Sequence, residues 1–285
     1  MNRIYITGAQ GFTGQHLVAH LATCGYEVLP ATANLLDPAG LANEVHALQP
    51  THVLHLAAIA FVAHGDAQQM YLTNLIGTRH LLEALKPVAG LQKVLLASSA
   101  NVYGNSDASP LHEQHAPAPA NDYAVSKLAM EHMARLYLPA LPAVFARPFN
   151  YTGPGQSADF LIPKLVAAFK RRDAQIELGN LDVFREFNDV RLTSAAYALL
   201  LAHGQAGSVV NVCSGQVYAL RDVLTLLSQL TGHNPDVSVN PAFVRANEVT
   251  RLCGDPSALH AIAAANGTAL PDYALRQTLS WMLET

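Results

Sequence analysis

The amino-acid sequence predicts an α/β fold in which a parallel, doubly wound sheet carries helices on both faces. Three features of the first 150 residues indicate this fold. Short β-like runs alternate with longer amphipathic runs, the β-like runs are nearly continuous Val, Ile, Leu and Ala, and a glycine-rich turn follows the first of them. Strand–helix–strand order at this spacing is typical of right-handed βαβ units, and strands that are apolar throughout are those covered on both faces.

The expected elements follow one another in a regular order. The strands are Arg3–Thr7, Tyr26–Leu29, His52–Leu56, Gln92–Ala97 and Ala143–Arg147, and the helices between them are Phe12–Cys24, Gln68–Leu85 and Asp122–Leu138. After Asn150 the chain becomes turn-rich, and a helix is expected from Ala158 to Arg171. We expect a dinucleotide-binding domain over residues 1–150 and a smaller α/β substrate lobe over residues 151–285. Within that lobe, about 190–212 should return to the first sheet as a helix and a strand.

The composition restricts the kinds of partner. Of 285 residues, 51% are hydrophobic and 13% are charged, which excludes wholesale disorder. A net charge of −4 does not favour a nucleic-acid surface, and no apolar run approaches the ~18 residues of a membrane span. The N-terminus shows no secretory leader, and three cysteines form neither a disulfide framework nor a zinc cluster. We therefore expect a cytoplasmic protein with neither nucleic-acid nor membrane partners.

A glycine-rich turn predicts the first binding site. Residues 7–14 read TGAQGFTG, so Gly8, Gly11 and Gly14 form a GxxGxxG pattern directly after the first strand. Glycines permit a tight turn and close approach of a pyrophosphate, which then binds the free N–H groups at the helix N-terminus. An ordinary tight turn is the alternative. The end of the second strand carries neither an acid nor an arginine, so the choice between NAD and NADP stays open.

Three side chains suggest acid–base chemistry at the same edge of the sheet. Tyr123 and Lys127 are four residues apart on one face of a predicted helix, and Ser99 follows a strand 24 residues upstream. A nearby ammonium should lower the pKa of the phenol, which could then exchange a proton with a carbonyl oxygen during hydride transfer. The Ser99 hydroxyl could hydrogen-bond the same oxygen. A solvent-facing helical pair is the alternative for Tyr123 and Lys127.

Several motifs together resemble the extended short-chain dehydrogenase/reductase superfamily, in its nucleotide-sugar branch. They are the TGxxGxxG turn, HLAA at 55–58, Asn74, SSxxVYG at 98–104, YxxxK at 123–127 and RPFN at 147–150. The resemblance implies a Rossmann-type fold that binds NAD(P)H, with Ser99, Tyr123 and Lys127 as the catalytic triad. Besides the glycines, Tyr123 and Lys127, it implies cofactor contacts at Phe12, Thr13, Asn34, Leu35, Leu56, Ala57, Ala58, Asn74 and Phe149.

Four second-lobe segments resemble GDP-6-deoxy-4-keto-mannose reductases: 146–160, 178–190, 211–216 and 240–249. The resemblance implies a GDP-linked substrate held by Ser99, Asn150, Arg185, Arg245 and Glu248. Arginine suits this task because its planar guanidinium binds a pyrophosphate bidentately. The chain departs from the family pattern at Asn34, where Asp is common, and at Tyr151 and Glu186.

The expected activity is NAD(P)H-dependent reduction of a nucleotide-linked 4-keto-6-deoxyhexose, namely GDP-4-keto-6-deoxy-D-mannose to GDP-D-rhamnose. A 4,6-dehydratase needs a further acid and base after the catalytic hydroxyl residue, where this chain has Ala100 and Asn101. An NAD-dependent nucleotide-sugar 4-epimerase stays open, as does a catalytically silent, cofactor-sensing protein.

Two further expectations concern metals and assembly. No metal site is expected, because His16 and His20 have no acidic or cysteine partner nearby. The family resemblance implies a homodimer packed through the helices at 68–85 and 122–138.

Overall fold

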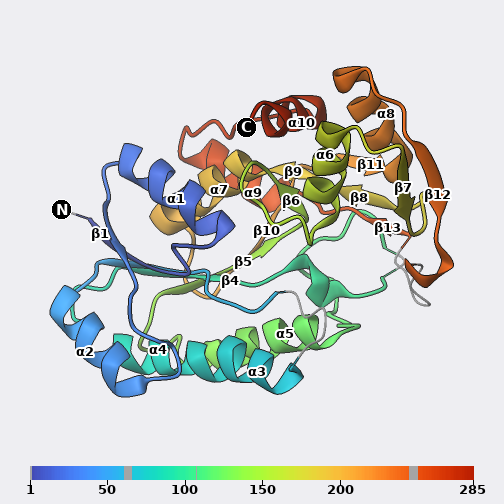
Figure 1. The fold of residues 1–285 in the computed structure, drawn as a ribbon. Coiled ribbons are helices and arrows are strands. Elements are labelled where there is room, and N and C mark those ends of the chain that lie inside the picture. Colours follow the sequence, from blue (N-terminus) through green and yellow to red (C-terminus); the bar gives the residue numbers. More distant parts are fainter. Residues whose placement is uncertain (1, 61–65, 107, 244–249) are drawn as a thin grey trace.

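The computed structural model describes residues 2–60, 66–106, 108–243 and 250–285. Within these ranges, six parallel strands form one sheet in the order β10-β5-β4-β3-β1-β2, which confirms the predicted fold class (Figure 1). The strands are β1 (Arg3–Thr7), β2 (Glu27–Pro30), β3 (His52–His55), β4 (Lys93–Ala97), β5 (Ala143–Pro148) and β10 (Val209–Val212).

The order of the strands reverses at β1. Tyr5 of β1 pairs with Leu29 of β2 on one side and with Val53 of β3 on the other. The chain therefore adds β2 on one side of β1 and then crosses over to add β3 on the other side. In open α/β sheets of this kind, ligands bind beyond the carboxyl ends of the strands at the reversal. The crevice at the ends of β1 and β3 is therefore where a binding site is expected.

Helices cover both faces of the sheet (Figure 1). Helices α1 (Phe12–Thr23), α7 (Val190–His203) and α9 (Ser257–Ala265) pack on one face, with residues such as Leu17 and Leu200 in the core. Helices α2 (Pro38–Leu48), α4 (Thr78–Leu85) and α5 (Asp122–Arg135) pack on the other, with residues such as Leu41 and Met130. Burial on both faces explains why the strands are apolar throughout.

The helix expected at residues 68–85 consists of three consecutive segments. They are α3 (Ala67–Tyr71), the π-helix η1 (Leu72–Gly77) and α4. A π-helical turn holds one residue more than an α-helical turn and rotates the side chains that follow it. Helix α2 is an addition to the predicted elements. It begins at Asp37, whose carboxylate accepts a hydrogen bond from the Gly40 amide at 3.0 Å.

The second part of the chain builds a smaller lobe with its own core. Its elements are β6 (Tyr151–Thr152), α6 (Leu161–Arg171), β7 (Gln175–Leu178), β8 (Phe184–Glu186), β9 (Asn188–Asp189), β11 (Val217–Ala219), α8 (Leu220–Thr231), β12 (Asp236–Val239), the 3₁₀-turn η3 (Pro241–Phe243), β13 (Arg251–Leu252) and α10 (Leu275–Glu284). Helix α6 begins three residues later than expected, because the Ser157 hydroxyl accepts the Asp159 amide and forms a turn. Between these elements, α7 and β10 return to the large sheet, where β10 pairs with β5.

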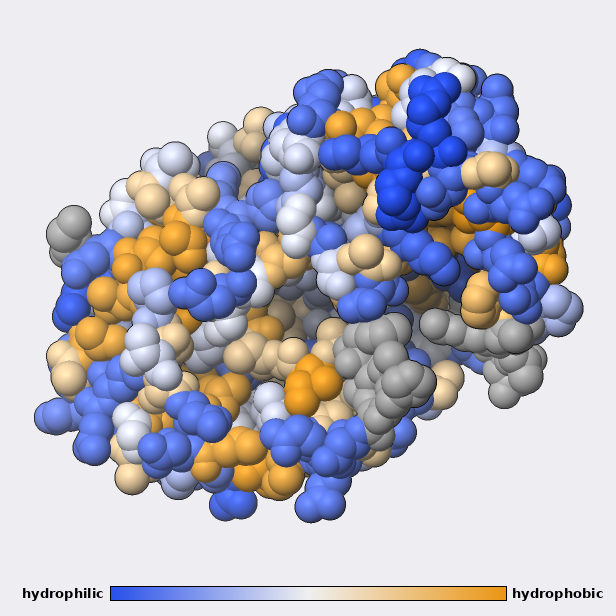
Figure 2. All heavy atoms as spheres, in the orientation of Figure 1, coloured by the Kyte–Doolittle hydropathy of each residue, from blue (hydrophilic) through white to orange (hydrophobic). Residues whose placement is uncertain are grey.

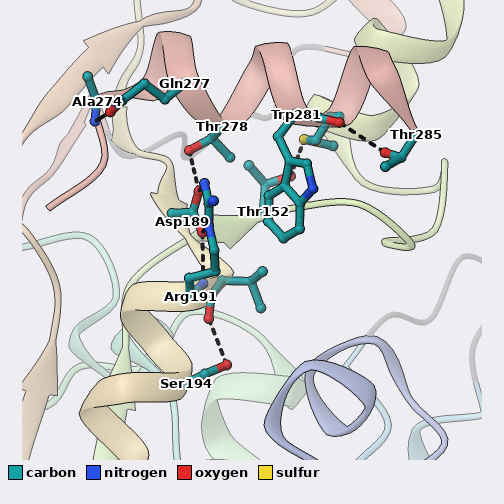
Figure 3. A network of polar contacts seen from close by, with 11 residues as sticks. Thr152, Asp189, Arg191, Ser194, Ala274, Gln277, Thr278, Trp281 and Thr285 are labelled. Carbon is teal, nitrogen blue, oxygen red and sulfur yellow. Dashed lines mark hydrogen bonds and ion pairs between the residues drawn. The ribbon is translucent and has the colours of Figure 1, made fainter. Parts of the chain in front are cut away.

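A hydrogen bond and a cation–π contact attach α10 to an ion pair at the start of α7 (Figure 3). Asp189 is buried, caps α7 and pairs with Arg191 at 2.7 Å, while the Thr278 hydroxyl donates to the same carboxylate at 2.7 Å. The Arg191 guanidinium lies between the rings of Tyr273 and Trp281, 3.6 and 4.2 Å from their centres. The buried carboxylate thus has both a charge partner and hydrogen-bond donors.

No helix among the described residues is both long and apolar enough to cross a membrane.

Candidate active site

The predicted site residues gather along one edge of the sheet. Gly8 follows β1, Leu56–Ala58 follow β3, Ser99 follows β4 and Phe149 follows β5. Parallel strands bring their carboxyl ends to the same edge, so residues far apart in sequence lie together there. In the space-filling view, the surface is hollowed between the body that holds the large sheet and the smaller lobe, whose visible face is mostly hydrophilic (Figure 2).

The glycine turn fits a dinucleotide pyrophosphate. Gly8 has φ +73°, and a Cβ on it would lie 2.8 Å from the amide nitrogen of Ala57. A Cβ on Gly14 would lie 2.3 Å from the Gly8 carbonyl oxygen, so this glycine permits close packing of α1 on the turn. Gly11 is the N-cap of α1 and provides no side chain to occupy the first amides. The turn therefore leaves helix N–H groups and the positive end of the helix dipole available to an anion.

Thr13 and Phe12, two predicted cofactor-binding residues, both contact Tyr151. The hydroxyl groups of Thr13 and Tyr151 are 2.7 Å apart, and the Phe12 and Tyr151 rings stack with their centres 6.0 Å apart. Tyr151 thus connects the first turn of α1 to β6 of the smaller lobe. The sequence marked this residue only as a departure from the family pattern.

Asn74 connects the end of β3 to helix α5. It is 1% exposed; its Oδ1 accepts from the Ile59 amide at 2.8 Å, and its Nδ2 donates to the Ile59 carbonyl and the Ser126 hydroxyl, each at 3.0 Å. Ser126 in turn donates to the Tyr123 carbonyl at 2.7 Å. Both amide hydrogens of Asn74 are therefore bonded within the protein. For the predicted contact with the cofactor, the side chain can offer only the second lone pair of Oδ1, as an acceptor.

Ser99, Tyr123 and Lys127 come together where β4 ends beside α5. Ser99 caps the 3₁₀-turn η2 (Ala100–Tyr103), and its hydroxyl lies near the Tyr123 phenol, whose pKa it lowers. The Lys127 ammonium donates to the Ala97 carbonyl at 2.7 Å and lies 6.0 Å from the centre of the Tyr123 ring. Helix α5 begins at the Asn121 cap, so both side chains lie in its first two turns.

The expected lowering of the Tyr123 pKa by Lys127 is wrong for this structure. Burial raises the pKa of Tyr123 well above its ordinary value, and the nearby Ser99 hydroxyl offsets this only in part. Burial also lowers the pKa of Lys127 to about 8, which weakens its charge in alkaline solution. Without bound ligands the phenol therefore keeps its proton at neutral pH, and this is the form that can protonate a carbonyl oxygen.

The remaining predicted residues occupy different surroundings. Leu35 is buried against η1, whereas Asn34 is exposed and its Oδ1 accepts from the Leu36 amide at 2.9 Å. Asn150 is exposed, and its carbonyl accepts from the Asn188 amide at 2.9 Å. Arg185 lies half-buried on β8, and its guanidinium donates to the Phe184 carbonyl at 2.8 Å. Arg245 and Glu248 lie outside the described residues.

The buried Glu186 joins three segments of the smaller lobe. It accepts hydrogen bonds from the amides of Gly254 (2.6 Å), Ser214 (2.9 Å) and Gly215 (3.3 Å), and from the Asn188 side chain (3.0 Å). The pKa of Glu186 is raised overall, because the effect of burial is larger than the lowering by these hydrogen-bond donors. The carboxylate adjoins Arg185 in sequence, so it fixes the strand on which that arginine stands.

Sequence reasoning missed the buried carboxylate of Glu131 on α5. It pairs with Arg147 of β5 at 2.7 Å and accepts from the Ser98 hydroxyl. The sequence does contain a signal for this residue: Glu131 follows Lys127 by four residues, and side chains four apart lie on the same helix face. Among the described residues, there is no group of three or more His, Cys, Asp and Glu side chains that could hold a metal ion.

A doubly wound parallel sheet, a glycine turn after β1 and a Ser/Tyr/Lys set beside β4 define a short-chain dehydrogenase/reductase of the extended type. Residues 4–213 match the NAD dependent epimerase/dehydratase family, and the chain belongs to it. It is an NAD(P)-dependent oxidoreductase.

Two curated relatives and one solved structure are similar over nearly the whole chain. The GDP-6-deoxy-D-mannose reductase of Pseudomonas aeruginosa is 36% identical over 296 residues, covering 99% of this chain and 96% of that protein. The GDP-6-deoxy-D-talose 4-dehydrogenase of Aggregatibacter actinomycetemcomitans is 35% identical over 264 residues, covering 90% of each. RMD from Pseudomonas aeruginosa, solved with NADPH, has a TM-score of 0.90 and 35% identity, covering 100% of this chain and 98% of that one.

Proposed function

We propose that this enzyme uses NADPH or NADH to reduce the 4-keto group of GDP-4-keto-6-deoxy-D-mannose, giving GDP-D-rhamnose. The observation that carries the proposal is the complete Ser99, Tyr123 and Lys127 set in a chain that is 36% identical, over almost its full length, to a GDP-6-deoxy-D-mannose reductase. We also propose that the enzyme acts in the cytoplasm, with residues 1–150 binding the dinucleotide and 151–285 the sugar nucleotide.

The side chains divide the reaction between them. The Ser99 hydroxyl hydrogen-bonds the 4-keto oxygen, and the protonated Tyr123 phenol gives its proton to that oxygen as charge develops. The Lys127 ammonium stabilises the phenolate that remains. A reduced nicotinamide, when bound, supplies the hydride to C4. Arg185, with Arg245, binds the pyrophosphate of the sugar nucleotide, and Asn150 and Glu248 bind its other polar groups.

The residues after Ser99 support reduction over dehydration. Ala100 and Val102 are buried and apolar, and Asn101 has an amide side chain. None of these groups titrates near neutral pH, so none can remove a proton from C5 and return it to a leaving hydroxyl.

Two related activities give different results in one experiment. Reduction from the opposite face of C4 would give GDP-6-deoxy-D-talose, the sugar named in the relative that is 35% identical. A 4-epimerase would oxidise and then reduce the same carbon with no net use of cofactor, and would retain its NAD during purification.

The test follows reduced-nicotinamide absorbance with purified protein, freshly prepared GDP-4-keto-6-deoxy-D-mannose, and NADPH or NADH in parallel. We expect protein-dependent loss of absorbance and a product whose proton spectrum shows the large H3–H4 coupling of an equatorial 4-hydroxyl. A small coupling would identify the talose product. No loss of absorbance with either cofactor would refute the proposed reduction, and retained NAD with UDP-sugar conversion would then identify an epimerase.

The Tyr123→Phe variant tests the proton transfer itself. Because phenylalanine fills nearly the same volume but has no proton to give, we expect turnover to be lost while cofactor binding, measured by fluorescence titration, persists. Ser106→Ala is the matched control, since it also removes one hydroxyl, on a loop outside the Ser99, Tyr123 and Lys127 set. Substantial turnover by Tyr123→Phe would refute the role of the phenol.

We also propose a homodimer that packs through α4 and α5. Leu136 is 79% exposed, and Val125, three helical turns earlier on the same face, is also exposed. A groove of about 500 Å³ is lined in part by Leu136, Met133 and Tyr137. Light scattering should give twice the chain mass for the natural protein and the single mass for Leu136→Glu. A monomeric natural protein would refute the dimer.

A further inference from the structure

Three successive residues at the end of β4 each lie against a different turn of helix α5. The Ala97 carbonyl accepts from Lys127 at 2.7 Å, the Ser98 hydroxyl donates to Glu131, and the Ser99 hydroxyl lies near the Tyr123 phenol, whose pKa it lowers. Tyr123, Lys127 and Glu131 are spaced by four, so they form one stripe along the helix. Two of the three contacts belong to the proposed catalytic set. The third, between Ser98 and Glu131, has no role in the proposed reaction.

Glu131 is held rigidly. It is 2% exposed, and Arg147 of β5 binds it through two parallel hydrogen bonds, Nε to Oε1 at 2.9 Å and Nη2 to Oε2 at 2.7 Å. The Ser98 amide also donates to the Ala146 carbonyl of β5 at 2.8 Å. A bidentate pair fixes both position and orientation. The turn that carries Ser99 is therefore held from two sides, by β5 and by Glu131.

Glu131 also lies one helical turn after Lys127 on α5, and its charge acts on the buried Lys127 ammonium. Lys127 is 3% exposed, and burial disfavours its charge while Glu131 favours it. The other titratable neighbours are Tyr123 on the same helix and His55 on β3, whose pKa of about 3 leaves it neutral. Arg147, on β5, is paired with Glu131. Within the described residues, Glu131 is thus the anion that offsets the burial of Lys127.

We propose that Glu131 is a positioning residue of the reaction, which fixes the Ser98–Ser99 turn against α5 and supplies the negative charge that keeps the Lys127 ammonium charged. The alternative is a purely structural ion pair with Arg147. The part of the proposal that concerns turnover depends on the proposed reductase function. The part that concerns the charge of Lys127 does not.

The charge of Lys127 can be measured without any substrate. The chain has only five lysines, so ε-¹³C-lysine labelling gives few NMR signals, and the Lys127 signal is the one that disappears in Lys127→Met. In Glu131→Gln, which keeps the shape and removes the charge, we expect the titration midpoint of Lys127 to fall by on the order of one pH unit. An unchanged midpoint would overturn the proposal.

Two further variants separate charge from structure. Glu131→Gln leaves Arg147 buried without a counter-charge and could unfold for that reason alone. The double variant Glu131→Gln/Arg147→Met removes both charges and keeps similar volumes, so we expect stability to recover while the Lys127 midpoint stays low. Recovery of the natural midpoint would show that Glu131 serves only to pair Arg147. Asp182→Asn is the control, because it breaks the exposed Asp182–Arg221 pair.

Turnover is the second readout. If the proposed reductase reaction is correct, the alkaline limb of the kcat/KM profile should move down with the Lys127 midpoint, which reduces activity above it up to about tenfold. A limb that stays in place while the midpoint moves would overturn the link to turnover. If the natural protein does not turn over the proposed substrate, the proposed function fails, and the NMR result still decides whether Glu131 controls the charge of Lys127.

Discussion

Replacing Gly8 by alanine should reveal how closely the dinucleotide turn approaches the end of β3. The new Cβ would lie 2.8 Å from the Ala57 nitrogen and 3.0 Å from its Cα, both of them backbone atoms. Such overpacking costs about 1–3 kcal/mol. The left-handed φ of +73° adds about 1–2 kcal/mol, and the stiffer unfolded chain returns about 0.4–1 kcal/mol.

Gly25→Ala isolates the close approach from the backbone strain. Gly25 has φ +81°, a Cβ there would meet nothing within 4 Å, and it lies at the other end of α1. The strain and the unfolded-chain contribution are therefore shared by the two variants and cancel when they are compared. We expect Gly8→Ala to be less stable than Gly25→Ala by about 1–3 kcal/mol, the overpacking cost alone.

Urea unfolding of both variants measures this difference, and fluorescence titration with NADPH and NADH measures binding. Because the turn must move away from Ala57, we expect Gly8→Ala to bind cofactor at least about tenfold more weakly, equivalent to about 1.4 kcal/mol, whereas Gly25→Ala binds normally. Equal stabilities of the two variants, together with natural cofactor affinity in Gly8→Ala, would refute the reasoning.

Three further predictions concern pH, the β3–α5 connection and the α10 contact. Because the pKa of Lys127 is about 8, its ammonium is charged below that pH and loses its charge above it. We therefore expect kcat/KM to fall as the pH rises through about 8, and a flat profile to pH 9.5 would contradict this. Asn74→Ala removes the hydrogen bonds to the Ile59 amide and carbonyl and to the Ser126 hydroxyl, which should lower the free energy of unfolding by about 1–3 kcal/mol in urea, and no loss would show that these bonds are replaced. Thr278→Val removes one donor from the buried Asp189 carboxylate and should cost about 1.5–3 kcal/mol in the same assay, with natural cofactor affinity.

The strands and the glycine turn were predictable because they depend on local pattern. Continuous apolar runs such as residues 94–97 can be buried on both faces only in a covered sheet, and the glycine spacing follows from the close approach of backbone to backbone. The four-residue spacing of Tyr123 and Lys127 likewise places them on one helix face whatever surrounds them. These features need no knowledge of tertiary contacts.

Other features depend on tertiary contacts that a sequence does not display. The π-helical turn at 72–77 has no periodic signature, because it inserts a single residue into a helix. The pKa of Tyr123 was predicted in the wrong direction because burial, which acts on both Tyr123 and Lys127, outweighs the charge of Lys127 and is not visible in the sequence. Glu186 and Glu131 look like surface residues by type, and only the fold shows the donors that compensate for their burial.

The position of β10 in the sheet has a consequence for synthesis on the ribosome. β10 covers the outer edge of β5, yet the chain from β6 to α7 must be translated between them. Until β10 has been synthesised, the edge of β5 presents unpaired backbone groups, which are sites for pairing with other nascent chains. Trp281 of α10 also packs against His16 of α1, their ring centres 5.6 Å apart, so α1 gains this contact only after Trp281 has been synthesised. That edge of β5 is therefore open to pairing with other chains until β10 has been synthesised.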